Sequence, residues 1–337
     1  MKTRHYNIPI FIPEMACPFQ CVYCDQQKIT GQHNLLNDDE IIQTIEQHLK
    51  TFRSAEREVQ LAFFGGTFTG LSIQEQKHYL NIIQPFISSQ DIQGIRISTR
   101  PDYINIDNLK LLKQYGVTHI ELGAQSLVGE VLKASFRGHS VEDVQIAAKL
   151  ILDEGFTLGL QMMIGLPEDS PERSLETAGK IVAFGAQETR IYPTIVIRGT
   201  NLAQLWLKGK YQALSTESAI KQSANLLSYF EENKVKVLRI GLYPSDELTA
   251  QGDAIAGPEM PHFKEKVLTY LWKNNLEKDI DFLKKEKKLI IAVSPKEYNF
   301  AVGFTAGNRK YLETYFSKVK FVINQKLKGR DYELVYY

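Results

Sequence analysis

The sequence has very few cysteines, only three among its 337 residues. A small and odd number argues against a disulfide framework, because secreted domains of that kind pair several cysteines. The chain also lacks an excess of either charge, with a formal net charge of +1. Its first apolar run is interrupted by Pro9 and Pro13, which makes it too short for a signal peptide or a membrane span. We therefore expect no membrane segment and a cytoplasmic location.

The overall composition, with 43% hydrophobic and 23% charged residues, is that of a globular protein with a large core. The length allows one large barrel or two domains, and the distribution of charge favours a division. Residues 281–337 contain 12 Lys and Arg against 6 Asp and Glu, a local balance of +6 that leaves −5 for the preceding residues. We predict a barrel over residues 1–245 and a small α+β module over residues 246–337.

All three cysteines, Cys17, Cys21 and Cys24, lie within eight consecutive positions. Three thiolates on one short loop can hold three irons of a 4Fe-4S cluster, and without a fourth cysteine the last iron stays open to another ligand. An open iron favours catalysis over electron storage. A structural zinc site is the first alternative, but it needs four closed ligands, and the nearest candidate, His33, is not part of a second ligand pair. Unrelated buried cysteines are the second alternative.

Short β-rich apolar runs alternate with longer segments of helical periodicity over the first two thirds of the chain. This pattern is typical of repeated βα units around a parallel sheet, and it predicts an α/β fold, a partial TIM-like (β/α)6 barrel. The predicted strands are 8–12, 59–64, 95–98, 119–123, 158–164 and 188–192. The predicted helices between them are 38–52, 73–86, 108–115, 141–154 and 172–184.

A distinctive loop follows each of these strands, and in such folds the chemistry gathers at the carboxyl ends of the strands. The cysteine loop follows the first strand, and Gly65-Gly66-Thr67 follows the second. Glycines without a Cβ let a ligand approach the backbone closely, although a tight turn explains them equally well. Met162 and Met163 are adjacent on a strand, so they point to opposite faces, one into the core and the other toward this ring of loops.

The CxxxCxxC loop after the first strand, with the aromatic Tyr23 before its last cysteine, resembles that of the radical S-adenosylmethionine (radical SAM) enzymes. The resemblance implies that Cys17, Cys21 and Cys24 hold a 4Fe-4S cluster whose open iron binds SAM. The reduced cluster then cleaves SAM to a 5'-deoxyadenosyl radical, with electrons from a protein such as flavodoxin or ferredoxin. Gly65, Gly66 and Thr67 match the motif that contacts the SAM amino group, except that Thr67 replaces a common glutamate.

Two further polar residues fit a cofactor site of this kind. Gln125, at a strand end, suits the ribose or carboxylate of SAM. Arg137 suits the SAM carboxylate or an RNA phosphate, as does Arg100, and a surface ion pair is the alternative for both. His139 is the one histidine within a motif, and a structural role competes there with that of a general base.

A closer similarity, over residues 98–211, is to the radical SAM domain of the Elongator catalytic subunit, which modifies the wobble uridine of tRNA. It is carried by segments such as Arg137-Gly138-His139-Ser140 and Leu205-Trp206-Leu207-Lys208-Gly209. The residues after Gly257 show no pattern of that subunit's acetyltransferase domain, so we expect the radical step without the acyl donor. A small molecule or tetrapyrrole, as for coproporphyrinogen oxidase-like proteins, is the alternative substrate, and a noncatalytic iron-sulfur RNA-binding protein is the alternative class.

The basic C-terminal residues predict a strand-helix-helix-strand order, at 289–293, 295–301, 308–316 and 319–324, which resembles a KH module. Between the two helices lies Gly303-Phe304-Thr305-Ala306, where KH domains carry the GxxG loop that clamps a nucleic-acid backbone. Ala306 departs from that motif. With the lysine-rich run 284–288, the module is predicted to bind RNA through phosphate attraction, and a solvated lysine-rich face is the alternative.

Overall fold

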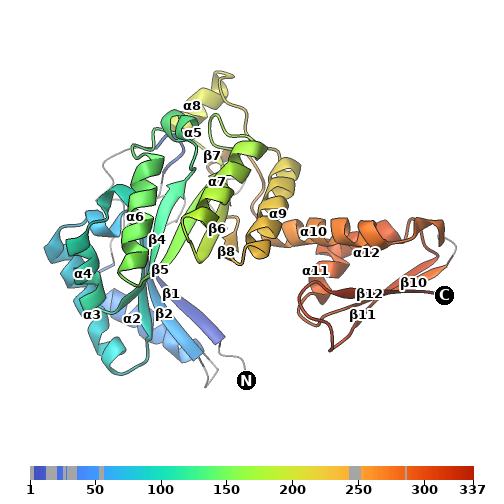
Figure 1. Cartoon of the computed structure of the whole chain (residues 1–337), viewed down its shortest axis with the longest axis horizontal. Helices are drawn as coiled ribbons and strands as arrows, with labels where there is room; N and C mark the ends of the chain where they lie inside the picture. The colour runs from blue at the N-terminus through green and yellow to red at the C-terminus, as the bar shows by residue number, and fades with distance from the viewer. Residues whose placement is uncertain are drawn as a thin grey trace.

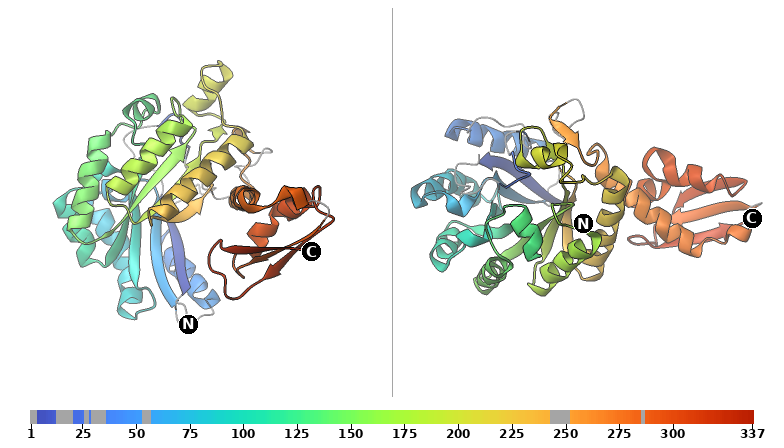
Figure 2. Two further views of the ribbon diagram at one scale, coloured as in Figure 1. Left: turned by 45° about the vertical axis from the view of Figure 1, so that its right-hand side comes forward. Right: turned by 90° about the horizontal axis from the view of Figure 1, so that it is seen from above.

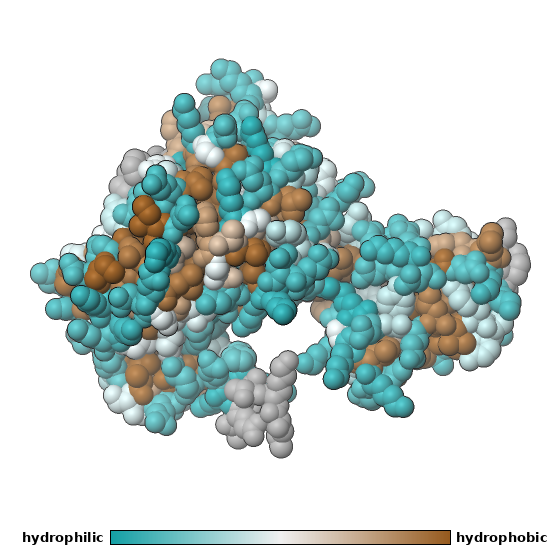
Figure 3. Space-filling model, in the orientation of Figure 1, coloured by the Kyte–Doolittle hydropathy of each residue, from teal (hydrophilic) through white to brown (hydrophobic). Residues whose placement is uncertain are grey.

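The computed structural model describes residues 4–12, 21–25, 28, 36–52, 57–242, 252–284 and 287–337. Cys17 and His33 lie outside these ranges. The described residues form a large α/β part and a smaller C-terminal part that projects from its side (Figure 1). The face shown in Figure 3 is mostly hydrophilic, with apolar residues in small groups between polar ones. Within the described ranges, no helix combines the length and the apolar character that crossing a membrane requires.

The large part is built on one sheet of seven parallel strands that curls into a half-barrel (Figure 2). The strands lie in chain order, so each crossover returns to the next position on the same edge. Their bounds are β1 (Arg4–Ile12), β2 (Arg57–Gly65), β3 (Gly94–Thr99), β4 (Val117–Gln125), β5 (Thr157–Ile164), β6 (Glu188–Pro193) and β8 (Lys236–Ile240).

Helices cover the outer face of this sheet (Figure 2). They are α2 (Asp38–Thr51), α3 (Ile73–Ser88), α4 (Ile106–Gln114), α6 (Val141–Asp153), α7 (Pro171–Ala183) and α9 (Thr216–Glu232). The first four begin with a capping box, in which an Asn or Ser side chain accepts from the backbone N–H three residues later. Outward-facing aliphatic residues of the strands pack against these helices in one continuous core. The predicted helices are therefore confirmed within a few residues.

The six predicted strands are confirmed as β1 to β6, and with them the partial barrel. The prediction misses the seventh strand, β8, which pairs with β6. In β8 the cations Lys236 and Arg239 interrupt the aliphatic residues, and most of the strand is only half-buried at the sheet edge. An edge strand of this kind lacks the continuous apolar run that marks a buried parallel strand.

Smaller elements lie at the carboxyl ends of the strands. They are the helices α5 (Gly129–Ala134) and α8 (Asn201–Leu207) and the two-stranded sheet of β7 (Val196–Ile197) and β9 (Ala254–Ala256). Residues of α5, α8 and β7 pack around Cys21, Val22 and Tyr23 in a separate apolar cluster. This cluster fixes the described part of the cysteine loop over the open end of the half-barrel.

The C-terminal part has its own core, formed around α10 (Phe263–Asp279), β10 (Lys288–Val293), α11 (Tyr298–Val302), α12 (Gly307–Leu312), β11 (Lys318–Ile323) and β12 (Tyr332–Tyr336). The predicted strand-helix-helix-strand order is confirmed, although both helices are shorter than predicted. The prediction misses β12, which adds to β10 antiparallel and makes the sheet mixed. Phe263 of α10 belongs to the barrel core and Trp272 to the C-terminal core. One helix therefore links the two cores, and the division after residue 245 stays a prediction.

Candidate active site at the open end of the barrel

The cysteine turn is held by neighbours from distant parts of the chain. Val22 donates from its backbone N–H to the Ser135 carbonyl at 3.2 Å, and its own carbonyl accepts from the Leu202 N–H at 2.7 Å. Cys21 is buried, and Cys24 is half-buried. These contacts place two of the three predicted ligands at the open end of the half-barrel, and Cys17 lies outside the described residues.

Arg137 lies directly beside this turn. One guanidinium nitrogen, Nη1, contacts Cys21 Sγ at 3.5 Å, and the other, Nη2, donates to the Gly123 carbonyl at 2.7 Å. A guanidinium group, which is always charged, thus contacts one of the three predicted cluster ligands. Burial raises the pKa of the neighbouring Tyr23 well above its usual value, against the lowering effect of Arg137. The described residues thus fit a thiolate-bound metal cluster.

The Gly65-Gly66 turn lies next to Ile12, the last residue of β1. A Cβ on Gly65, whose φ is +114°, would lie 2.0 Å from the Ile12 carbonyl oxygen. That oxygen also accepts from the Gly66 N–H at 2.9 Å. Glycine is therefore required at position 65 by the close approach of two strand ends, whatever binds there. Thr67 is buried, and the contact of this turn with the SAM amino group stays a prediction.

Gln125 and Arg137 converge above Gly123. A Cβ on Gly123 would lie 2.8 Å from Gln125 Nε2 and 2.9 Å from Arg137 Nη2, so the missing side chain makes room for both. Gln125 Oε1 also accepts from Gln161 Nε2 at 3.2 Å, which joins β4 to β5. Two predicted cofactor contacts thus lie side by side at the strand ends.

Arg100 is engaged in an ion pair, and His139 is a weak base. Arg100 is buried and forms a bidentate pair with Asp102, with Nε–Oδ1 and Nη2–Oδ2 distances of 2.9 Å, so this is not the surface ion pair of the alternative. A contact of Arg100 with SAM or RNA stays a prediction. Burial, together with the charges of Arg137 and Arg100, lowers the pKa of His139 to about 3. The imidazole is therefore neutral at physiological pH and a poor proton acceptor.

The two methionines separate as predicted. Met162 belongs to the core between sheet and helices, and Met163 belongs to the apolar cluster around Cys21. Met163 therefore lines the open end of the half-barrel.

The sequence prediction misses a network of buried charges on the inner face of the sheet. Both oxygens of Glu121 are bonded to Arg190, at 2.6 and 2.9 Å, and Oε1 also contacts Arg96 Nη1 at 2.7 Å. Arg96 Nη1 in turn lies 2.7 Å from Glu188. Although burial alone would raise the pKa of Glu121, the guanidinium groups of Arg190 and Arg96 hold it below its usual value. The sequence signal was the placing of Glu188 and Arg190 two residues apart in β6, which puts both on one face of the sheet but does not identify their partners.

This network lies below the open end of the site. Arg190 reaches upward to Phe64, with its guanidinium carbon 5.1 Å from the ring centroid, and Phe64 directly precedes Gly65. On the other side, a Cβ on Gly159 would lie 2.9 Å from Glu121 Cγ, so a glycine makes room for the carboxylate. The ion pairs close the lower part of the half-barrel and support the strand ends above.

Comparison with known proteins agrees with this geometry. A model of the Radical SAM superfamily matches residues 13–181, just over half of the chain, and a model of the Radical_SAM C-terminal domain matches residues 186–273. The chain therefore belongs to the radical SAM superfamily and is an enzyme of that class. Its cofactors are those of the family, a 4Fe-4S cluster and SAM. The noncatalytic alternative is thereby overturned.

Individual relatives indicate which radical SAM enzymes this chain resembles. They include the tRNA uridine(34) acetyltransferase of Methanocaldococcus infernus, 29% identical over 222 residues, and Elongator complex protein 3 of Homo sapiens, 32% identical over 213 residues. The matches cover 59% and 56% of this chain but 41% and 39% of those proteins. The chain thus spans about two fifths of the length of these relatives. The resemblance to the Elongator subunit is confirmed.

A solved structure supports the fold. The archaeal Elp3 of Methanocaldococcus infernus, with an N-terminal deletion, superimposes with a TM-score of 0.64 at 23% identity, covering 82% of this chain and 64% of that one. At this level of identity the likeness establishes the shared fold alone.

Proposed function

We propose that this radical SAM enzyme modifies RNA, and tRNA in particular. The observation that carries the proposal is the similarity, at about 30% identity over more than half of this chain, to proteins that include a tRNA uridine(34) acetyltransferase. The proposal is confined to the radical step, because the match covers about two fifths of those relatives. A cytoplasmic location and a flavodoxin or ferredoxin as electron donor belong to the same proposal.

The cofactor contacts in this proposal are the residues gathered at the strand ends. Cys17, Cys21 and Cys24 would hold three irons, and SAM bound at the fourth iron supplies the 5'-deoxyadenosyl radical. Gly65, Gly66, Thr67, Gln125, Tyr23 and Arg137 would orient SAM. The shared location of Gln125 and Arg137 above Gly123 supports a common ligand. The buried ion network below them excludes water from the base of the site.

The second part of the proposal concerns the C-terminal module, residues 246–337, which binds RNA. Its loop at 303–306 is anchored to α10, since the Phe304 N–H donates to Thr269 Oγ1 at 2.8 Å and the Phe304 ring lies 4.8 Å from that of His262. The following Lys310 is exposed, and Arg309 is half-buried. A rigid loop followed by two cations suits a phosphate backbone. The likeness to a KH module stays a prediction.

The test is the nucleoside profile of tRNA from cells that lack this protein. We expect one modified nucleoside to be missing, to return with the wild-type gene, and to stay absent with the Cys21→Ala variant. The variant separates the radical step from a merely structural role in tRNA binding. A profile that does not change on deletion contradicts the proposal and favours the small-molecule alternative.

A further inference from the structure

Phe136 is an aromatic side chain at the left-handed position that ends α5. It is 66% exposed, although it follows a helix that packs on the apolar cluster around Cys21. Its φ is +51°, and the Arg137 N–H donates to the Leu132 carbonyl at 3.1 Å, as is usual where a helix ends in this conformation. Gly and Asn are favoured there, so neither burial nor the helix end explains why the side chain is phenylalanine, and this points to a function.

The backbone that carries Phe136 is tied to the cysteine turn. The Ser135 carbonyl, one residue before it, accepts from the Val22 N–H, and Arg137, one residue after it, contacts Cys21. The Phe136 N–H itself donates to the Lys133 carbonyl at 3.1 Å, at the end of α5. These bonds set the position of the Phe136 backbone relative to Cys21.

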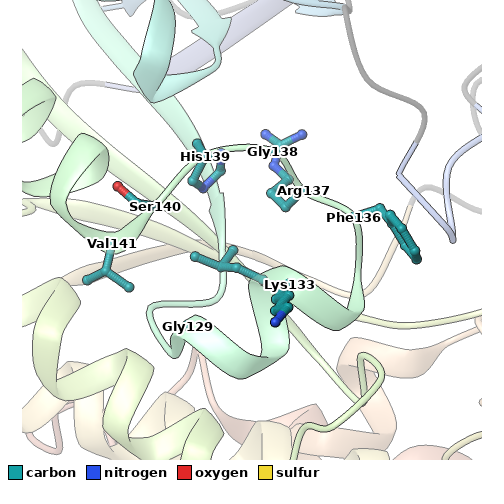
Figure 4. A pocket seen from close by; sticks show the side chains of 9 residues that line it. Gly129, Lys133, Phe136, Arg137, Gly138, His139, Ser140 and Val141 are labelled. Carbon is teal, nitrogen blue, oxygen red and sulfur yellow. The ribbon is translucent and has the colours of Figure 1, made fainter.

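A hollow of about 310 Å³ lies beside this ring, between α5 and the loop that follows it (Figure 4). Leu132, Phe136 and Val141 give it apolar walls, and Lys133 and Ser140 add polar atoms. The volume is at the lower end of the range for small-molecule sites. In Figure 4 the Phe136 ring points outward, on the side of the loop away from Val141.

The charge around this site favours a polyanion. Lys133 is exposed one turn before Phe136, and Lys208 and Lys210 are exposed at the end of α8, which packs on the same cysteine turn through Leu202. Residues 191–216 contain three cations, Arg198, Lys208 and Lys210, and no Asp or Glu. Among the described residues, α5 and residues 207–210 thus carry three exposed lysines against one exposed glutamate, Glu130. An exposed aromatic ring together with an excess of lysine is a combination that binds single-stranded nucleic acid.

We propose that Phe136 is a stacking platform for a nucleobase of the RNA substrate at the open end of the barrel, with Lys133, Lys208 and Lys210 facing its phosphates. This inference rests on the proposed function, and it names the part of the enzyme that holds RNA beside the cluster. The base lies against the exposed ring, and the anchored backbone around Phe136 sets the distance between the bound RNA and the reacting centre.

The experiment measures tRNA binding by fluorescence anisotropy for the wild type and for Phe136→Asn, Phe136→Tyr and Ile146→Ala. Asn suits the left-handed backbone but cannot stack, so we expect tRNA binding at least about tenfold weaker with a thermal midpoint equal to or above that of the wild type. Tyr keeps the ring, and we expect affinity within about twofold. Ile146, 52% exposed on the barrel helix α6, is the control for losing an exposed apolar side chain, and we expect no change in tRNA binding.

The outcomes separate this inference from the proposed function. If the wild type binds tRNA and Phe136→Asn binds it equally well, the inference is wrong and the proposed function stands. If Phe136→Asn instead slows reduction of the cluster by flavodoxin, with unchanged tRNA affinity, the ring belongs to the docking site of the reductant and the inference is wrong. If the wild type does not bind tRNA, the proposed function fails and the inference falls with it.

Discussion

Replacing Glu121 with glutamine should destabilise the fold far more than the loss of one charge at the surface. Both carboxylate oxygens are bonded to Arg190, and one is shared with Arg96. Both arginines are nearly buried, with 11% and 3% of their side chains exposed. Glutamine has almost the same volume, so the substitution removes the charge without creating a cavity. Arg96 then keeps Glu188, whereas Arg190 loses the carboxylate to which its Nε and Nη2 donate.

The loss of stability in Glu121→Gln depends on which arginine keeps a carboxylate partner. Breaking a buried ion pair by removing one member costs about 3–5 kcal/mol. Arg96 still has Glu188 at 2.7 Å, so the loss falls mainly on Arg190, and we expect a cost near the lower limit, about 3 kcal/mol. At roughly 2 °C per kcal/mol for a chain of this size, the midpoint of thermal unfolding should fall by about 6 °C.

The assay compares thermal unfolding of Glu121→Gln with that of Glu176→Gln. Glu176 pairs with Lys180 at 2.7 Å on the surface of α7, where half of the Glu176 side chain is exposed. An exposed pair on one helix contributes about 0.3–0.5 kcal/mol, so the control should unfold within about 1 °C of the wild type. If Glu121→Gln unfolds as late as this control, the account of the buried network is wrong.

Three further predictions follow from the same structure. Gly65→Ala should prevent stable folding, because its Cβ would lie 2.0 Å from the Ile12 carbonyl oxygen. In the control Gly129→Ala the new Cβ meets nothing within 4 Å, so this variant should express and unfold like the wild type. Soluble yield and circular dichroism measure whether each variant folds. The arginines lower the folded pKa of Glu121 below its ordinary value of 4.5, so the stability that this group contributes is complete above that pH and is lost as the pH falls through the folded pKa. Urea titrations below about pH 5 should therefore show a smaller loss of unfolding free energy for Glu121→Gln than for the wild type, and equal losses would contradict the assignment. Replacing Arg309 and Lys310 together with alanine should weaken tRNA binding and lower its dependence on salt by a slope of about two, and an unchanged slope would remove the C-terminal module from the RNA site.

Sequence patterns predicted the parts of this fold that are determined locally. Apolar runs predicted β1 to β6, and helical periodicity predicted the helices between them, because each signal lies within a few residues of its effect. The position of the candidate active site followed from the rule that the carboxyl ends of parallel strands lie at the same edge of a sheet. The cysteine spacing then predicted the cluster and the superfamily.

The parts that sequence reasoning missed depend on contacts between distant residues. Arg137 contacts Cys21 across 116 positions, and Arg190 reaches Glu121 across 69, so no local pattern reveals either pair. The glycine at position 65 was interpreted as open space for a ligand, and the structure adds a packing reason, since Ile12 comes from another strand. The exposed ring of Phe136 has no sequence signal, because its strain is visible only in the backbone angle.

The most direct test of the central claim, a cluster with one iron open to SAM, is the release of 5'-deoxyadenosine by anaerobically reconstituted protein given SAM and dithionite. The account predicts release by the wild type and none by Cys17→Ala, Cys21→Ala or Cys24→Ala, each of which removes one of the three predicted ligands. Release by any of the three variants, or a wild-type cluster with four protein ligands, would contradict it.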